Sequence, residues 1–146
     1  MLKILIAVDG SAHANRTIGA IGLMAQSSLD LQAIFLSVDP GVVLNPLFSS
    51  EYTITSIKQL AELQKMQQDA ILLDAVRQAK ELGIDNCKSV SAYGAIANEI
   101  MRVADEENCD QIAMGTRGMG AVVNLFLGSV AQAVVHRSAR PVLLVK

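Results

Sequence analysis

Three glycines and a serine in the last third of the chain have the spacing of a phosphate-binding cradle. Gly115 and Gly118 enclose two residues, and Gly128 and Ser129 follow after nine more. Glycine has no Cβ, so its backbone can approach a ligand closely. The first amides of a helix that opens at Gly128 would be unpaired and attract an anion. The spacing indicates a polyphosphate held between two glycine turns, but turn glycines beside a capping serine would look the same.

A carboxylate follows the first apolar segment, Leu2–Val8. This segment is nearly continuous in branched apolar residues, which is typical of a strand buried on both faces of a parallel sheet. Asp9 lies at its carboxyl end and either contacts a ligand or simply precedes a helix whose dipole favours negative charge. Ser11 is expected to cap that helix, which runs to about Met24.

The rest of the chain alternates between strands and helices, with a loop at 40–55. Further strands are predicted at Leu31–Val38, Cys87–Ala92, Gln111–Met114 and Pro141–Val145, and helices at Ser56–Leu82, Ile96–Glu107 and Ser129–Arg137. The first half of the helix from Ser56 is polar, includes Gln68, and is expected to project past the sheet. The alternation predicts one α/β domain over residues 1–146, a doubly wound parallel sheet of five strands with helices on both faces. Such sheets bind ligands beyond the carboxyl ends of their strands.

Composition excludes several classes of function. The net charge of −2 and the 3% of aromatic residues give neither a basic face nor stacking platforms for nucleic acid. No apolar run is long enough to span a bilayer. Cys87 and Cys109 lack CxxC spacing and suit a reducing compartment, so a cytoplasmic location is predicted.

The chain also lacks other familiar sites. His13 and His136 have no cysteine or carboxylate at ligand spacing, so no protein-built metal site is predicted, and His13 is expected at the surface. There is no Gly-Lys-Ser/Thr element, and the turn after the first strand lacks the dinucleotide fingerprint.

The spacing Gly-x2-Gly-x9-Gly-Ser resembles the nucleotide-binding signature of the universal stress protein family. Ile4–Ser11 and Arg140–Val145 are similar to the family's opening strand with its turn and to its closing strand, so the resemblance covers the whole chain. It implies a Rossmann-like fold of the adenine nucleotide alpha hydrolase type. In this family some members bind ATP and others do not, and members with the intact signature generally bind it.

The resemblance implies a role for each matched residue. The glycines and Ser129 would wrap the phosphates and ribose, and Met114 and Val130 would add flanking contacts. Asp9 would face the adenosine, and Val38 would line the adenine pocket. The residues implied in ATP binding, with Arg117 included as a partner for phosphate charge, are Asp9, Val38, Met114, Gly115, Arg117, Gly118, Gly128, Ser129 and Val130.

Two positions depart from the family pattern. Many relatives have basic residues in the spacer after Gly118, where Asn124 is the only polar side chain here. Phosphate charge would then rest on backbone amides, Arg117 and a divalent ion such as Mg²⁺. Relatives often have a proline two residues after the glycine corresponding to Gly94, where this chain has Ile96, which concerns only a turn.

The leading hypothesis is a regulatory ATP-binding stress-response protein that forms a homodimer. Pro141–Val145 is apolar and is expected at a sheet edge, where pairing with a second copy would satisfy its backbone. A helix or the loop at 40–55 could cover that edge instead. Two other functions stay open: a slow ATPase or phosphoryl-transfer enzyme, and a ligand-free structural dimer. Efficient catalysis is not expected, because the cradle offers one arginine and no evident base.

Overall fold

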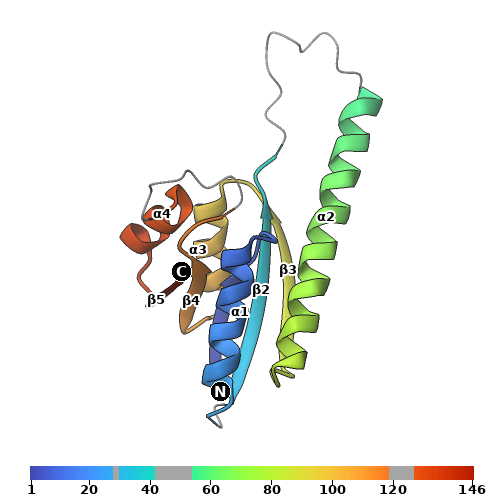
Figure 1. The fold of residues 1–146 in the computed structure, drawn as a ribbon. Coiled ribbons are helices and arrows are strands. Elements are labelled where there is room, and N and C mark those ends of the chain that lie inside the picture. Colours follow the sequence, from blue (N-terminus) through green and yellow to red (C-terminus); the bar gives the residue numbers. More distant parts are fainter. Residues whose placement is uncertain (28–29, 42–53, 119–126) are drawn as a thin grey trace.

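The computed structural model describes residues 1–27, 30–41, 54–118 and 127–146. Strands and helices alternate in the predicted order (Figure 1). The strands are β1 (Leu2–Ala7), β2 (Leu31–Asp39), β3 (Cys87–Tyr93), β4 (Gln111–Gly115) and β5 (Val142–Val145). The helices are α1 (Ala12–Ala25), α2 (Ile54–Glu81), α3 (Ile96–Glu106) and α4 (Ser129–Arg137).

All five strands pair in parallel, in the order β3-β2-β1-β4-β5. This confirms the predicted five-stranded parallel sheet. β1 is central, and its Ile6 is in register with Phe35 of β2 on one side and with Ala113 of β4 on the other. The strand order reverses between β1 and β4, and open sheets of this kind form their ligand crevice at such a point.

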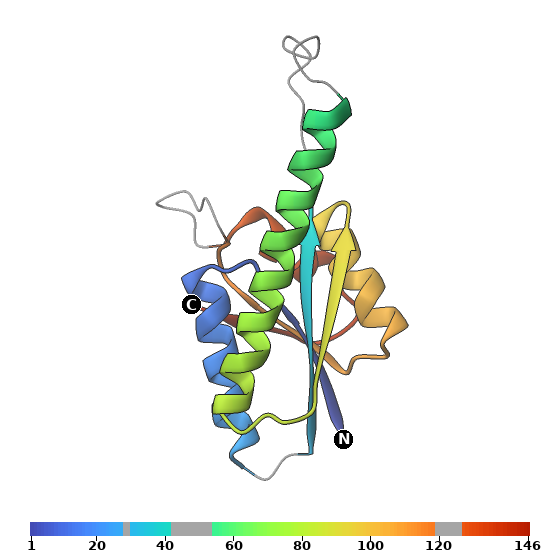
Figure 2. The ribbon, with the colours of Figure 1, turned by 90° about the vertical axis from the view of Figure 1, so that its right-hand side faces the viewer.

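Helices cover both faces of the sheet, α1 and α2 on one and α3 and α4 on the other (Figures 1 and 2). Side chains of a strand alternate between the faces. Ile4 and Ile6 therefore pack with Phe35 under α1 and α2, while Leu5 and Ile112 pack under α3 and α4. These side chains are at most 1% exposed, and full burial of each contributes about 1.5–3 kcal/mol.

Strand and helix ends differ from the prediction by one or two residues. β2 and β3 each continue one residue further, because Asp39 is in register with Tyr93 and the Gly94 N–H donates to the Asp39 carbonyl at 2.9 Å. Pairing with a neighbouring strand sets such ends, and a single segment carries no sign of it. Of the loop expected at 40–55, residues 42–53 lie outside the described residues.

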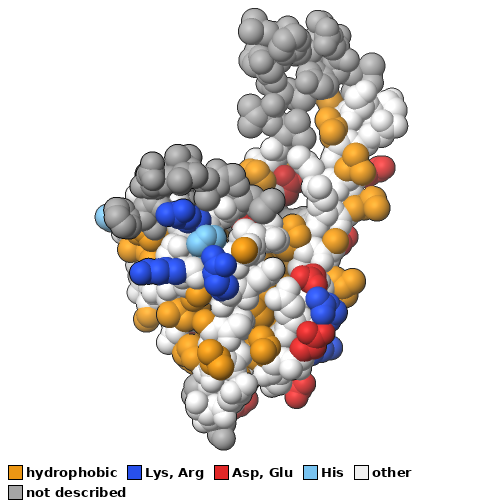
Figure 3. Space-filling view, in the orientation of Figure 1, with side chains coloured by type: hydrophobic (Ala, Val, Ile, Leu, Met, Phe, Trp, Pro, Cys, Tyr) orange, Lys and Arg blue, Asp and Glu red, His pale blue; other side chains and the backbone are white. Residues whose placement is uncertain are grey.

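The helix α2 is longer than the sheet that it covers. Its 28 residues span about 42 Å, and the first half extends past the strand ends, as predicted (Figure 1). Residues 55–67 are exposed or half-buried, and the exposed ones include the hydrophobic side chains of Leu63 and Met66. Figure 3 shows hydrophobic side chains on the surface along this helix. From residue 55 onward, Gln68 is the first buried residue of the helix. Within the described ranges, no helix is long and apolar enough to cross a membrane.

Candidate functional site

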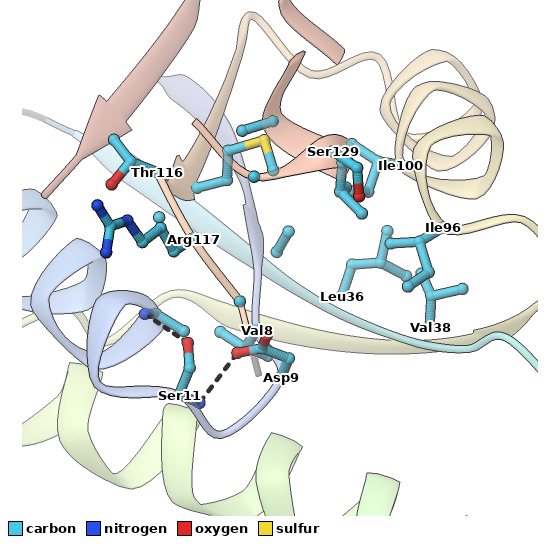
Figure 4. A pocket seen from close by; sticks show the side chains of 18 of the residues that line it. Val8, Asp9, Ser11, Leu36, Val38, Ile96, Ile100, Thr116, Arg117 and Ser129 are labelled. Carbon is cyan, nitrogen blue, oxygen red and sulfur yellow. Dashed lines mark hydrogen bonds between the residues drawn. The ribbon is translucent and has the colours of Figure 1, made fainter. Parts of the chain in front are cut away.

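A cavity of about 420 Å³ opens beyond the carboxyl ends of β1, β2 and β4, where the strand order reverses (Figure 4). All nine residues implied in ATP binding line it. Residues from the two ends of the chain meet here because parallel strands end at the same edge of the sheet. The lining residues are Ala7, Val8, Asp9, Ser11, Ala14, Leu36, Val38, Pro40, Ile96, Ile100, Met114, Gly115, Thr116, Arg117, Gly118, Gly128, Ser129, Val130 and Ala131.

The turn after β1 forms one wall. Gly10 has a φ of +79°, a conformation that favours glycine. The Ser11 Oγ accepts a hydrogen bond from the Ala14 N–H at 3.2 Å, which confirms the predicted cap of α1. The Ser11 N–H donates to Asp9 Oδ1 at 2.9 Å and so restrains the half-buried carboxylate at the cavity.

The end of β4 and the loop after it form the facing wall, and packing requires the glycine at the last position of the strand, Gly115. A Cβ at Gly115 would lie 2.6 Å from the Cβ of His13 and 3.0 Å from the Arg117 carbonyl oxygen. The first turn of α1 therefore requires glycine here. His13 is half-buried, not at the surface as expected, and its Nδ1 is buried with no hydrogen-bond partner in the described part of the chain.

Gly118 and Gly128 lie where the loop after β4 approaches the turn after β1 and the start of α4. A Cβ at Gly118 would lie 2.6 Å from Asp9 Oδ2. A Cβ at Gly128 would make ordinary contact with the Thr116 carbonyl oxygen at 3.4 Å and would point toward the Gly118 N, 4.0 Å away. A side chain at position 118 would thus displace Asp9. A side chain at position 128 would enter the space between Gly118 and the start of α4, which we call the gap between the turns.

The helix α4 begins at this gap without a side-chain cap. Gly128 is the N-cap, with extended dihedral angles (φ −68°, ψ 161°), and Ser129 is the first helical residue, so Ser129 does not act as the cap. The first amides of a helix lack intrahelical partners and carry partial positive charge. This helix start can therefore donate several hydrogen bonds to an anion in the cavity.

The backbone of Thr116 fixes the loop from both sides. Its N–H donates to the Val145 carbonyl at 2.9 Å, and its carbonyl accepts from the Gly128 N–H at 2.7 Å. The end of β5 and the start of α4 are thereby held against the same residue, which is 8% exposed.

The opposite end of the cavity is apolar. Leu36 and Val38 of β2 face Ile96 and Ile100 of α3 (Figure 4). The sequence prediction included Val38 but missed the two isoleucines. Their signal was present, because residues four apart on a helix share a face and α3 is predicted to pack on the sheet. Ile96 thus lines the cavity, although the sequence suggested only a turn there.

The main chain of Val38 faces β1, but β1 ends before reaching it. Residues Ala33 and Asp39 of β2 bond to the β3 side, so alternate residues such as Leu36 and Val38 direct their peptide groups toward β1. The last such bond runs from the Val8 N–H to the Leu36 carbonyl at 2.9 Å. No β1 partner for the Val38 N–H or carbonyl is found among the described residues, which leaves a donor and an acceptor side by side at the apolar end.

The charged residues of the cavity are few. Arg117 is half-buried, and its guanidinium extends toward Thr116, away from Leu36 and Val38 (Figure 4). Asp9 is the only carboxylate among the described lining residues, and no cluster of three potential metal-ligating side chains occurs in the described ranges. Asn124 lies outside them.

The whole chain matches a family model. Residues 1–146 fit the model of the universal stress protein family. A universal stress protein of Thermus aquaticus, from the 3' region of a QAH/OAS sulfhydrylase, is 33% identical over 145 residues, which cover 98% of this chain and 97% of the relative.

Solved structures share the fold. Protein MJ0577 of Methanocaldococcus jannaschii superposes with a TM-score of 0.83 at 24% identity, over 99% of this chain and 94% of its own. A universal stress protein crystallised in complex with cAMP superposes with a TM-score of 0.72 at 23% identity, over 99% of this chain and 97% of its own.

Proposed function

The chain belongs to the universal stress protein family, and from that premise we propose that it binds ATP, alone or with Mg²⁺, as a regulatory stress-response protein. The observation that supports the proposal is the division of one cavity into an apolar end and an amide-rich end. A nucleotide has the same division between its base and its phosphates.

The base would lie at the apolar end, between Val38 and Ile96. The Watson–Crick edge of adenine presents a donor and an acceptor side by side, which complements the N–H and carbonyl of Val38. Guanine presents a different pattern at that edge, so the site would favour adenine. The family structure in complex with cAMP supports adenine as the base, because cAMP carries it.

The phosphates would lie in the gap between the turns, near Gly118, Gly128 and the first amides of α4, with Ser129 and Val130 at the helix start. Asp9 would face the adenosine from the other turn. Mg²⁺ would arrive bound to the phosphates, because Asp9 is the only carboxylate that the described lining offers.

Binding is a better match to these residues than efficient phosphoryl transfer. Transfer requires charge positioned around the γ-phosphate. The described lining supplies one arginine, Arg117, and no base besides Asp9. Slow hydrolysis would therefore be incidental to a regulatory role.

The proposal includes a cytoplasmic homodimer. β5 borders the sheet, and the four residues Val142–Val145 are all half-buried. An apolar edge with unpaired backbone groups favours pairing with the same strand of a second copy.

Calorimetry with ATP and with GTP, each with and without Mg²⁺, tests the proposed function. ATP is expected to bind at least about tenfold more tightly than GTP, equivalent to about 1.4 kcal/mol. Mass spectrometry of small molecules released from freshly purified protein is expected to detect an adenine nucleotide. Folded protein, verified by circular dichroism, that binds no ATP would contradict the proposal.

A further inference from the structure

A buried glutamine joins α2 to the sheet directly behind the cavity. Gln68 is 8% exposed, and its Nε2 donates to the carbonyl oxygens of Ser37 at 2.7 Å and Ala92 at 3.0 Å. Both hydrogens of one amide are thus directed to neighbouring strands, β2 and β3. The sequence placed Gln68 in the polar, projecting half of α2, and its burial differs from that expectation.

The two acceptors lie at the level of the proposed base pocket. Ala92 is in register with Val38, and Ser37 immediately precedes Val38 in the chain. Val38 packs on the α3 and α4 side of the sheet and lines the cavity, whereas Gln68 approaches from the opposite face. The glutamine therefore holds the end of β2 from behind, without access to a ligand.

A second contact from α2 reaches the other wall of the cavity. A Cβ at Gly10 would lie 3.4 Å from Cγ1 of Ile71, so Ile71 packs under the turn that carries Asp9. Gln68 and Ile71 are three residues apart and lie on the same side of the helix. One helix thus supports both backbone segments that would enclose the adenosine.

A hydrophobic residue of similar size could fill the space of Gln68 without needing hydrogen-bond partners, whereas a buried amide without its partners would cost free energy. The two hydrogen bonds are therefore what glutamine adds at this position. Each carbonyl oxygen has two lone pairs, so the strand carbonyls can accept from the sheet and from Gln68 together. The amide therefore restrains the backbone near the ends of β2 and β3 through hydrogen bonds. Hydrogen bonds are directional, whereas apolar packing at the same place would not be.

We propose that Gln68 is a positioning residue for nucleotide binding, which fixes the end of β2 so that the Val38 peptide groups meet the adenine edge. The inference rests on the proposed function. Because coupling is reciprocal, a nucleotide that prefers this position of Val38 also stabilises the contact between Gln68 and the strands.

Two substitutions of Gln68 distinguish a role in nucleotide binding from a role in the stability of the fold alone. Gln68→Met keeps the volume and removes both donors. Gln68→Glu places a carboxylate opposite two carbonyl oxygens at neutral pH and one O–H donor there when protonated, and burial raises the pKa of such a carboxyl group. The matched controls are Gln67→Met and Gln67→Glu, because Gln67 is exposed on the same turn.

ATP affinity is measured by calorimetry between pH 5.5 and 8, each variant relative to the unmodified protein. Gln68→Met is expected to bind about five- to tenfold more weakly at every pH, the scale of one or two hydrogen bonds. Gln68→Glu is expected to bind more weakly still at pH 8 and to recover as the pH falls, while the Gln67 variants stay unchanged. A purely structural role would lower the melting temperature but leave the affinity ratios flat, which would overturn the inference.

Hydrogen exchange on the unmodified protein tests the same coupling without a variant. Saturating ATP is expected to slow amide exchange in α2 around residues 64–72. ATP binding with unchanged exchange there would refute the role of Gln68 while leaving the proposed function intact. Failure of the unmodified protein to bind ATP would instead refute the proposed function, and the inference with it.

Discussion

Asp9 Oδ2 occupies space that a side chain at Gly118 would need, since a Cβ there would lie only 2.6 Å from it. The two residues are far apart in the sequence and come from the loops that follow β1 and β4. Glycine at position 118 therefore serves the placement of a neighbouring carboxylate, in addition to any approach of a ligand.

Gly118→Ala is expected to weaken ATP binding about tenfold with little change in stability. The Asp9 carboxylate is the flexible end of a short side chain, so it can move, but moving strains its bond to the Ser11 N–H. Calorimetry gives the affinity, and thermal unfolding gives the stability. Wild-type affinity in this variant would show that the position of Asp9 is irrelevant to binding.

Gly128→Val is expected to abolish ATP binding while α4 stays folded. The dihedral angles of Gly128 suit any residue, but the added methyl groups would enter the gap toward Gly118. Gly128→Ala is the matched control, because its Cβ makes only ordinary contact with Thr116 and it should retain part of the affinity. A folded valine variant with unchanged affinity would exclude the gap as the phosphate site.

Gly115→Ala is expected to destabilise the fold by about 1–3 kcal/mol, the usual cost of overpacking. Its Cβ would meet the Cβ and backbone carbon of His13, which cannot move independently of α1. Gly19→Ala in α1 is the control: apart from its chain neighbours and the nearby backbone of α1, no described atom would lie within 4 Å of its Cβ, and alanine should stabilise the helix by up to about 1 kcal/mol. Denaturant unfolding measures both, and equal stability of the two variants would contradict the packing argument.

Val142→Pro is expected to convert the proposed homodimer into a folded monomer. Pro141 and Val145 bond to β4 through their carbonyls, so the N–H of Val142 points outward from the sheet edge. Proline removes that outward donor and leaves the β4 ladder in place. Sedimentation equilibrium distinguishes the states. An unmodified protein that is monomeric at tens of micromolar, where micromolar affinities are detected, would refute the dimer.

The two thiols are expected to react slowly with iodoacetamide in the folded protein. Burial raises the pKa of Cys109 and of Cys87, so the reactive thiolate is scarce at pH 7. Because these pKa values are higher in the folded state, the stability that they contribute is present below the unfolded pKa of about 8.5 and is lost as the pH rises above it. Mass spectrometry of the alkylated protein at pH 7 and pH 9.5 measures how fast the two thiols react, and rapid labelling at pH 7 would contradict the expected slow reaction.

The approximate places of the strands and the glycine spacing can be predicted from the sequence, and parallel strands bring the residues that follow them to one edge of the sheet. The sequence therefore predicts that Asp9, Val38 and Gly118 lie close together. Contacts between helices and loops were not readable. The burial of His13 against Gly115 depends on how α1 sits on the sheet, which no local pattern encodes.

The burial of Gln68 could not be predicted for the same reason, because it depends on how a helix packs on the sheet. A glutamine in a polar stretch indicates an exposed position, and only the register of α2 against β2 and β3 turns it inward. Ile96 and Ile100 were available as an apolar pair on α3, but their place in the cavity follows from the layer that α3 occupies.

The two hydrogen bonds of Thr116 have a consequence for how the protein would respond to its own abundance. The Thr116 N–H donates to the Val145 carbonyl, and the Thr116 carbonyl accepts from the Gly128 N–H. In the proposed homodimer, a second subunit paired with β5 would restrain Val145, and through these bonds would order Thr116 and the start of α4 before a nucleotide enters. The entropy of that ordering would then be lost on association and not on binding. ATP affinity would rise with protein concentration, and a cell that makes more of the protein would also make each copy a tighter binder.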